Sequence, residues 1–288
     1  MSKDAAASEK RPSQGAFALR FLTTLLILPL ILFLIWAPRL DWAFTGFIAI
    51  LAAVGAYEYY EIVRRRDVSP ETAGGILSTG LVVLSAHTYQ LATTAFTLYC
   101  GCFLVAALHL FRGRHSVTAL AGSVFGIVYV GWFAAHMALL RGIPHTGPAL
   151  LTMLIAAVAL NDAAAYVVGS AIGRHKMAPK VSPNKTWEGA VAGFAAAVLG
   201  MAVFHLLRNA FPVLAVPQWS FARFLCTGAI LSVAAQIGDL VESFMKRSAG
   251  VKDSGFLFPG HGGVLDRADG FLFAAPVLYY MVTPPFHA

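Results

Sequence analysis

The sequence predicts an all-α, polytopic integral membrane protein, a helix bundle with about nine transmembrane helices and a cytoplasmic N-terminus. Two observations lead to this prediction. Hydrophobic residues make up 58% of the 288 residues and charged residues only 12%, against about 25% charged residues in a typical soluble domain. The apolar residues also fall into blocks of about 20, the length that a helix needs to cross a bilayer. Both observations argue against a soluble globular fold.

The apolar blocks define the predicted spans in order along the chain. Residues 1–17 are polar and rich in Ala, Ser and Lys, which indicates a disordered cytoplasmic terminus. The first block is too long for the apolar part of a signal peptide, and no clear cleavage site follows it, so we interpret it as a membrane helix. The predicted spans are 18–37, 42–62, 72–88, 92–111, 117–138, 148–172, 189–207, 221–243 and 268–284.

The Lys and Arg residues predict the orientation, because cytoplasmic loops of membrane proteins carry an excess of them. With a cytoplasmic N-terminus and alternating spans, 17 of the 21 Lys and Arg residues fall on the cytoplasmic side and four on the other. The four are Arg39, Arg141, Arg208 and Arg223. The net charge of +7 is therefore spread over short loops, which fits membrane topology and a phosphate-rich site better than a nucleic-acid-binding face.

Two predicted cytoplasmic loops, residues 173–188 and 244–267, are dense in Gly, Pro, Lys and Asp. Such chemistry in loops between plain apolar spans is typical of functional sites. We therefore divide the chain into N-terminal transmembrane helices, residues 18–147, and a C-terminal region, residues 148–288. The second region holds both loops and, we expect, the catalytic site.

The end of the eighth span carries polar residues at helical spacing. The spacing i, i+3, i+4, i+7 and i+8 places five of them on one helix face: Asp239, Glu242, Ser243, Lys246 and Arg247. An unpaired carboxylate at the depth of Asp239 is unfavourable in a membrane, so we expect either an ion pair or a metal ligand there. The pair would form with Lys246 or with a neighbouring helix. We favour the metal ligand, because acids inside a membrane usually mark a site.

The loop that follows combines glycines, cations and acids. Three glycines surround His261 and let the backbone approach a ligand closely. Exposed backbone amides beside Lys252 and Arg267 would form an anion site. Asp266 and Asp269 open the last span, where carboxylates are favourable at a helix N-terminus. Each feature alone fits a flexible turn with capping acids, but their combination favours a binding site.

The loop before the seventh span has a partly structural explanation. Ser182 or Thr186 is placed to cap the following helix, with Glu188 in its first turn. Capping does not explain Lys180 and Lys185, although solvated loop lysines are common. The start of a phosphate-binding helix would use all of these groups.

Acidic residues occur in two further spans. Asn161 and Asp162 interrupt the sixth span, where Asp162 would either pair with a Lys or Arg of another span or help to hold a cation; we favour a role in the site. Glu58 and Glu61 close the second span just ahead of three arginines. Pairing at i,i+3 accounts for both of these glutamates.

Carboxylates, cations and Gly-rich backbone at a membrane surface suit phosphoryl or nucleotidyl transfer. Oxygen ligands favour a hard cation such as Mg²⁺, which neutralises phosphate charge. The sequence holds no P-loop, no Rossmann glycine fingerprint and no G-x-S-x-G elbow. The residues themselves therefore indicate metal-dependent phosphate chemistry on a lipid, and no more than that.

The run 243–269 resembles the signature of the phosphatidate cytidylyltransferase (CDP-diglyceride synthase) family. That signature reads S-x-apolar-K-R, four residues, K-D, an apolar link, H-G-G, D-R and D. The matching residues are Ser243, Lys246, Arg247, Lys252, Asp253, His261, Gly262, Gly263, Asp266, Arg267 and Asp269. Ala268 departs from it, since the family usually has a larger apolar residue or Thr there, which is a difference in packing. The run 182–189 and the pair Asn161–Asp162 also resemble this family.

The resemblance implies an enzyme that transfers CMP from CTP to phosphatidic acid and gives CDP-diacylglycerol and pyrophosphate, in phospholipid biosynthesis. It implies Mg²⁺, with K⁺ as a second cation, held by Asp239 and Asp266. The further metal ligands would be Asp253, Asp269 and Asp162. The groups implied for catalysis and phosphate binding are Lys246, Arg247, Lys252 and Arg267, with Lys180 and Lys185. The substrate-binding set is completed by Ser182, Thr186, Ser243, His261, Gly262 and Gly263.

The resemblance also implies partners and a location. Members of the family are homodimers, and the substrates are CTP and a lipid of the surrounding bilayer. A short chain with a cytoplasmic N-terminus suits a bacterial inner (plasma) membrane, with the active site facing the cytoplasm. No nucleic-acid partner is expected.

Two other classes compete with this interpretation. The first is a different lipid-phosphate enzyme, either a polyprenol or dolichol kinase or a CDP-alcohol phosphotransferase, but the D-G-x-x-A-R pattern of the latter is absent. The second is a transporter or channel, in which Asp162 and Asp239 would bind an ion. A transporter would leave the H-G-G loop and the clustered cations unexplained, and it more often shows an internal repeat, which this sequence lacks.

Overall fold

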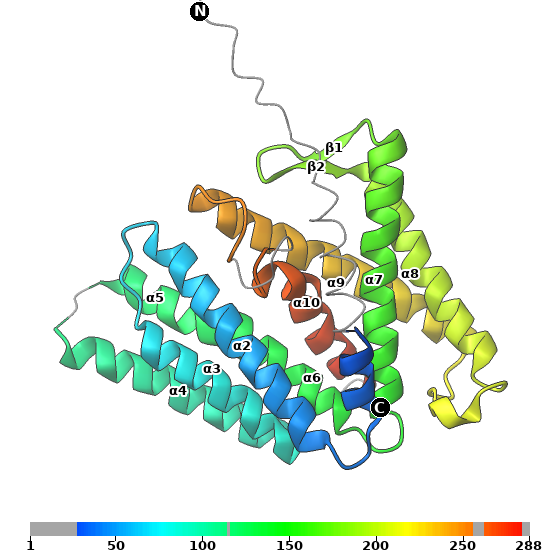
Figure 1. Ribbon diagram of the computed structural model, residues 1–288, viewed down its shortest axis with the longest axis horizontal. Helices are drawn as coiled ribbons and strands as arrows, with labels where there is room; N and C mark the ends of the chain where they lie inside the picture. Colours follow the sequence, from blue (N-terminus) through cyan, green and yellow to red (C-terminus); the bar gives the residue numbers. More distant parts are fainter. Residues whose placement is uncertain (1–27, 114–115, 256–261, 284–288) are drawn as a thin grey trace, which may run out of the picture.

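The computed structural model describes residues 28–113, 116–255 and 262–283, and it is a bundle of helices with one short hairpin (Figure 1). Residues 28–36 are helical. The helices of the first half are α2 (Asp41–Arg64), α3 (Thr72–Ser85), η1 (Ala86–Thr88) and α4 (Leu91–Phe111). A continuous helical stretch follows, made of α5 (Val117–Gly126), the π-helical η2 (Ile127–Trp132) and α6 (Phe133–Arg141).

The second half of the chain supplies the longer helices. They are α7 (Gly147–Ile172), α8 (Trp187–Leu207), α9 (Phe221–Ser248) and α10 (Leu265–Val282), with the short 3₁₀ helix η3 (Pro212–Leu214) before α9. Helix α9 therefore continues past 243, the end predicted for the eighth span. The first residues of the predicted loop 244–267 are helical as a result.

The predicted membrane class agrees with the structure. Where the structure describes them, the apolar blocks coincide with helical residues, for example 148–172 with α7 and 189–207 with α8. Within the described residues, six helical stretches are long and apolar enough to cross a bilayer. They are Asp41–Arg64, Leu91–Phe111, Val117–Arg141, Gly147–Ile172, Trp187–Leu207 and Phe221–Ser248.

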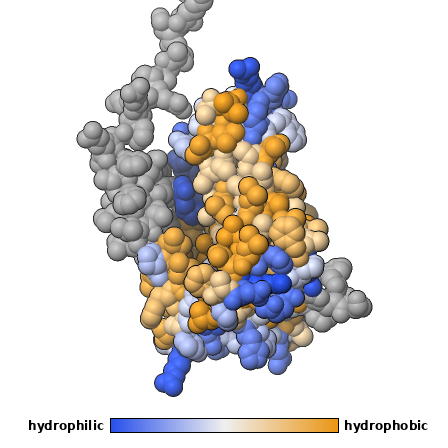
Figure 2. All heavy atoms as spheres, turned by 90° about the vertical axis from the view of Figure 1, so that its right-hand side faces the viewer, coloured by the Kyte–Doolittle hydropathy of each residue, from blue (hydrophilic) through white to orange (hydrophobic). Residues whose placement is uncertain are grey.

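The surface supports the same conclusion, because large apolar side chains point outward. On α8, Val191, Leu199 and Leu206 are 64%, 65% and 70% exposed. Figure 2 shows the side of the molecule on which α8 lies, with hydrophobic residues over most of its middle and hydrophilic residues gathered toward its ends. Soluble proteins rarely expose so much contiguous apolar surface, whereas lipid tails would cover it without cost.

Two groups of helices pack together in the bundle. Helices α2, α3 and α4 lie side by side, while α7 packs on α8, α8 on α9, and α9 on α10 (Figure 1). Small residues let α8 approach α7 closely: a methyl group at Gly193 would lie 2.7 Å from the backbone oxygen of Asn161. Close approach through small residues is a common way for membrane helices to gain packing contacts.

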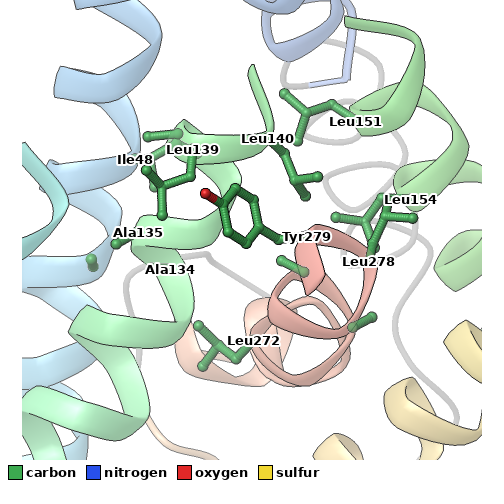
Figure 3. Packing of buried hydrophobic residues seen from close by; sticks show 14 of the residues in the cluster. Ile48, Ala134, Ala135, Leu139, Leu140, Leu151, Leu154, Leu272, Leu278 and Tyr279 are labelled. Atoms are coloured by element: carbon green, nitrogen blue, oxygen red, sulfur yellow. The ribbon is translucent and has the colours of Figure 1, made fainter. Parts of the chain in front are cut away.

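The core lies where the two groups meet. Figure 3 shows Tyr279 of α10 surrounded by residues of α2, α6 and α7. Ile48, Leu139 and Leu154 are among these residues, and each is less than 10% exposed. Helix α10 is therefore the element that joins the N-terminal helices to the C-terminal ones.

The predicted loop 173–188 is not entirely irregular, so the all-α description needs one addition. Strand β1 (Lys176–Ala178) pairs antiparallel with β2 (Ser182–Thr186), with Lys176 opposite Thr186. The hairpin stands at the end of α7 from which α8 begins (Figure 1). The hairpin continues directly into α8, and this connection fixes the direction in which the side chains of the hairpin point.

Candidate active site

The base of the hairpin is held by the residues predicted to cap α8. Thr186 is the N-cap, and its hydroxyl accepts a hydrogen bond from the backbone N–H of Gly189 at 3.2 Å. The carboxylate of Glu188 lies 2.6 Å from Nδ1 of His175 across the hairpin. These contacts set the position of β2, and the Lys185 ammonium then lies 2.6 Å from the Asp239 carboxylate of α9.

Two further acids lie near this ion pair. Asp239 of α9, Asp162 of α7 and Asp269 of α10 lie close enough for their charges to act on one another. Lys185 is near enough to offset part of this negative charge at both Asp162 and Asp269. Like charges that approach in this way are unfavourable without a cation, so the group favours positively charged partners. The sequence alternatives for Asp239 were an ion pair and a metal ligand, and the structure shows an ion pair with the hairpin rather than with Lys246.

A buried polar network fixes the position of Asp162. The side-chain amide of Asn161 donates to the Asp162 carboxylate at 3.0 Å. Its oxygen accepts hydrogen bonds from the Ser232 hydroxyl at 2.7 Å and the Gln236 amide at 2.9 Å, both on α9. Satisfied polar networks in an apolar interior hold one arrangement, so α7 presents Asp162 in a fixed position relative to α9.

About two turns after Asp239 on α9, Lys246 lies between two acids. Its ammonium is 2.5 Å from Glu242 and 2.5 Å from Asp266 of α10. The Lys246, Glu242 and Asp266 side chains are only 12%, 1% and 8% exposed. A buried cation shared by two carboxylates fixes all three groups, because none of them can leave without stranding a buried charge.

Asp266 also holds the glycine turn that precedes α10. Its second oxygen accepts hydrogen bonds from the backbone N–H groups of Gly263 at 2.8 Å and Ser254 at 3.0 Å, and from the Ser254 hydroxyl at 2.9 Å. Gly262 has a φ of +80°, and a methyl group there would lie 2.5 Å from the Asp266 carboxylate. The turn therefore requires glycine both for its backbone conformation and for space.

Glu58 belongs to the same polar cluster, which the sequence interpretation did not anticipate. Its buried carboxylate accepts hydrogen bonds from the N–H groups of Val264 at 3.0 Å and Leu265 at 2.8 Å, rather than pairing with a nearby arginine. The expectation was correct for Glu61, which pairs with Arg64 at 2.5 Å. The signal that distinguishes the two is spacing, because Glu58 has no basic residue three or four positions after it.

Arg247 and Ser243, two residues of the predicted site, form hydrogen bonds with other parts of the protein. The Arg247 guanidinium donates to the backbone oxygens of Val181 in the hairpin and Val251 after α9, both at 3.2 Å. The Ser243 hydroxyl lies 3.4 Å from an oxygen of Asp239. Arg247 therefore ties the hairpin to the loop that follows α9.

The remaining predicted residues surround these contacts. Ser182 is partly exposed on β2. Four predicted residues have exposed side chains: Lys180, Lys252, Asp253 and Arg267. His261 lies outside the described residues. The structure thus pairs Lys185 with Asp239, and Lys246 with Glu242 and Asp266.

An apolar pocket adjoins the polar cluster. It has a volume of about 350 Å³ and is lined by residues of α2, α6, α7 and α10, among them Ile48, Ala52 and Leu154. Arg267 lines the same pocket beside Val264 at the start of α10. The pocket therefore combines an apolar interior with a guanidinium group, close to the acids of α10.

The carboxylates of the site can be compared with what a bound Mg²⁺ would need. Within the residues that the structure describes, no three His, Cys, Asp or Glu side chains are grouped closely enough to hold a metal ion. Mg²⁺ usually keeps several waters and binds one or two carboxylates together with substrate phosphates. Asp239, with a side chain 36% exposed and two acids near it, fits that requirement.

Comparisons with known proteins show the family to which the chain is similar. A model of the cytidylyltransferase family matches residues 18–284. A phosphatidate cytidylyltransferase of Brucella suis is 37% identical over 263 residues, which cover 90% of this chain and 91% of that protein. The phosphatidate cytidylyltransferases of Synechocystis and Bacillus subtilis are 32% and 29% identical, over 84% and 91% of this chain and 88% and 96% of their own lengths.

Proposed function

The chain belongs to the cytidylyltransferase family and transfers CMP from CTP to phosphatidic acid, and we propose that the polar groups of α7, α9, α10 and the hairpin perform this transfer. The products are CDP-diacylglycerol and pyrophosphate. A phosphate oxygen of phosphatidic acid attacks the α-phosphorus of CTP. The bond from that phosphorus to the bridging oxygen breaks, and pyrophosphate leaves with the bonding electrons.

The observation that carries the assignment is that consecutive residues of α10 belong to a charged group and to an apolar pocket. Asp266 pairs with Lys246, as Asp239 of α9 pairs with Lys185, and we propose that the triphosphate lies beside these two lysines. Arg267, the residue after Asp266, lines the apolar pocket. Two substrates of opposite character, a nucleotide and a lipid, would meet there at their phosphates.

The cations of the site have defined tasks in this proposal. Lys185 and Lys246 bind phosphate oxygens of CTP, and each ammonium group is oriented by an ion pair with an acidic side chain. Arg267 binds the phosphate of phosphatidic acid, since a guanidinium group matches the geometry of phosphate oxygens. Lys180 and Lys252, which are exposed, draw the nucleotide in from solvent. Thr186 and Ser182 place the hairpin against the triphosphate.

We propose that Asp239, with Asp162 and Asp269 beside it, holds Mg²⁺ together with the triphosphate, with K⁺ as a companion cation. Asp253 is exposed nearby in sequence and completes the proposed set. The bound cation would neutralise phosphate charge and so assist departure of pyrophosphate. Asp266 contributes by orienting Lys246 and the glycine turn, because its oxygens already accept hydrogen bonds from both.

The apolar pocket would receive the acyl part of phosphatidic acid. Its volume of about 350 Å³ lies within the range of ordinary ligand pockets, and Arg267 would hold the head group at its mouth. The pocket is lined by α2 and α6 as well as by α7 and α10. The N-terminal helices, 18–147, would thus take part in lipid binding while the region 148–288 carries the chemistry.

We also propose the topology that the charge distribution favours. About nine spans would place the N-terminus, the hairpin and the loop before α10 on the cytoplasmic side, where CTP is available. The membrane would be the bacterial inner membrane, and the functional unit a homodimer. Reaction of single introduced cysteines with a membrane-impermeant reagent, before and after the membrane is opened, tests the orientation.

The test of the site uses purified protein in detergent with phosphatidic acid, Mg²⁺ and CTP labelled in its α-phosphate. Label in the lipid and an equal amount of pyrophosphate are expected from the wild type. Asp239→Asn is expected to lose both products, whereas Glu61→Gln, a surface acid outside the site, keeps them. Release of CDP in place of pyrophosphate would instead indicate a kinase. Full activity of Asp239→Asn would refute the proposed site.

A further inference from the structure

Glu58 is a buried acid of α2 whose carboxylate accepts hydrogen bonds from Ser254 and from the residues that follow the glycine turn before α10. It is 4% exposed and lies on α2, 206 residues before Val264. In the part of the chain that the structure describes, its carboxylate meets hydrogen-bond donors and no Lys or Arg side chain. A buried carboxylate without a cation is costly unless every oxygen is satisfied, so this position serves a specific set of donors.

The first donors are the amides that open α10. One Glu58 oxygen accepts from Val264 N–H at 3.0 Å and the other from Leu265 N–H at 2.8 Å. The first N–H groups of a helix have no partner within it, and Val264, the N-cap of α10, provides no side-chain hydrogen bond. Glu58 therefore caps α10 from another helix, and its negative charge matches the positive end of the helix dipole.

The third donor connects Glu58 to Asp266. The Ser254 hydroxyl lies 3.1 Å from Glu58 and 2.9 Å from Asp266, and it shares its one proton between them. Two glycines leave room for this contact, because a methyl group at Gly255 or Gly263 would overlap the Glu58 carboxylate. The sequence around the turn is thus shaped to receive a side chain from α2.

We propose that Glu58 is a positioning residue for the reaction. It holds Ser254, the glycine turn and the first turn of α10 in place, and through them it orients Asp266 and the Lys246 ammonium. It touches neither substrate. The inference rests on the proposed site for its kinetic consequence, whereas its effect on the position of the turn can be measured separately.

The experiment compares Glu58→Gln with Glu71→Gln in the purified full chain. Glutamine keeps the size of Glu58 but replaces one acceptor oxygen with an NH₂ group that faces an N–H donor. Glu71 is a matched control because it is also buried, 1% exposed, and paired with Arg112, but its contacts lie in the N-terminal helices. The readouts are kcat and KM for both substrates, thermal stability, and the rate of trypsin cleavage after Lys252.

Glu58→Gln is expected to lower kcat by on the order of tenfold to a hundredfold, because small displacements of catalytic groups have effects of this size. KM for CTP and for phosphatidic acid should change less than kcat does. Cleavage after Lys252 should become faster. Glu71→Gln should lose stability while kcat and cleavage after Lys252 stay as in the wild type. Glu58→Asp, which keeps the charge but has a shorter reach, should recover part of kcat.

Wild-type kcat in Glu58→Gln, or an equal fall of kcat in Glu71→Gln, would overturn the inference. If Glu58→Gln does not fold, Ser254→Ala decides, since it removes only the bridging hydroxyl. Reduced kcat in that variant supports the inference, and wild-type kcat overturns it. Full activity of Asp266→Asn would count against the proposed role of Asp266 and not against the contact made by Glu58. In that case faster cleavage after Lys252 in Glu58→Gln would still show that Glu58 holds the segment before α10 in place.

Discussion

Replacement of Lys246 by Met should destabilise the protein far more than loss of a surface charge. Lys246 is 12% exposed and lies 2.5 Å from both Glu242 and Asp266, which are 1% and 8% exposed. The methionine fills most of the same space but leaves two carboxylates buried side by side without a cation. Removing one partner from a buried ion pair typically costs about 3–5 kcal/mol, because the remaining charge stays desolvated.

The matched control is Arg64→Met. Arg64 pairs with Glu61 at the same distance of 2.5 Å, but these side chains are 48% and 37% exposed. Exposed pairs of this kind contribute about 0–1 kcal/mol. Both variants remove an ion pair, one buried and one exposed. The difference between their changes in the free energy of unfolding therefore measures the effect of burial on the pair.

The assay is equilibrium unfolding of the purified chain in mixed micelles, with a denaturing detergent as the titrant. The free energy of unfolding should fall by about 3–5 kcal/mol for Lys246→Met, which is roughly two to four orders of magnitude in the unfolding equilibrium. Adding Glu242→Gln to Lys246→Met should recover part of the loss, because it removes one of the two stranded charges. A loss of less than about 1 kcal/mol, equal to that of Arg64→Met, would show that the cluster is solvated and that the argument from burial is wrong.

Three further predictions concern the site. Lys185→Gln should raise KM for CTP in steady-state kinetics by roughly tenfold to a hundredfold, the value of one charge-assisted hydrogen bond. Lys176→Gln on the same hairpin should leave KM for CTP unchanged, and equal effects of the two variants would count against the pairing of Lys185 with Asp239. Gly263→Ala should lower both stability and kcat, because its methyl group would overlap the Glu58 carboxylate. Gly46→Ala, where the methyl group would enter open space, should be tolerated, and wild-type stability and kcat of Gly263→Ala would contradict the close contact between Gly263 and Glu58. Removal of Mg²⁺ by EDTA should abolish formation of labelled lipid and added Mg²⁺ should restore it, whereas activity without divalent cations would refute the magnesium proposal.

The helices could be predicted from the sequence because each depends on its own residues. A run of about 20 apolar residues specifies a membrane helix whatever it packs against, so the expected spans fall on helices wherever the structure describes them. The cap of α8 was also predictable, since the Thr186 side chain bonds within its own turn and Glu188 lies in that turn. The continuation of α9 past the apolar span was indicated by the helical spacing of the polar residues from Asp239 to Arg247, although the apolar signal itself ends at 243.

The hairpin and the Glu58 contact depend on distant partners, which one sequence does not reveal. The segment from Lys176 to Thr186 lacks alternating apolar residues, and its strands are held partly by the contact between His175 and Glu188. Glu58 satisfies amides more than 200 residues away. Local spacing could indicate that it needed a partner, but it could not identify which one.

The distance along the chain between Glu58 and its partners has a consequence for synthesis in the cell. A ribosome that adds about 5–20 residues per second needs roughly 10–40 s to reach Val264 after Glu58 has emerged. During that interval α2 carries an acid whose final partners do not exist, and water must satisfy it. Helix α10 therefore completes the surroundings of Glu58 in the first half of the protein, and a chain released before α10 has been made lacks Asp266 and the contacts that Glu58 makes with it through Ser254.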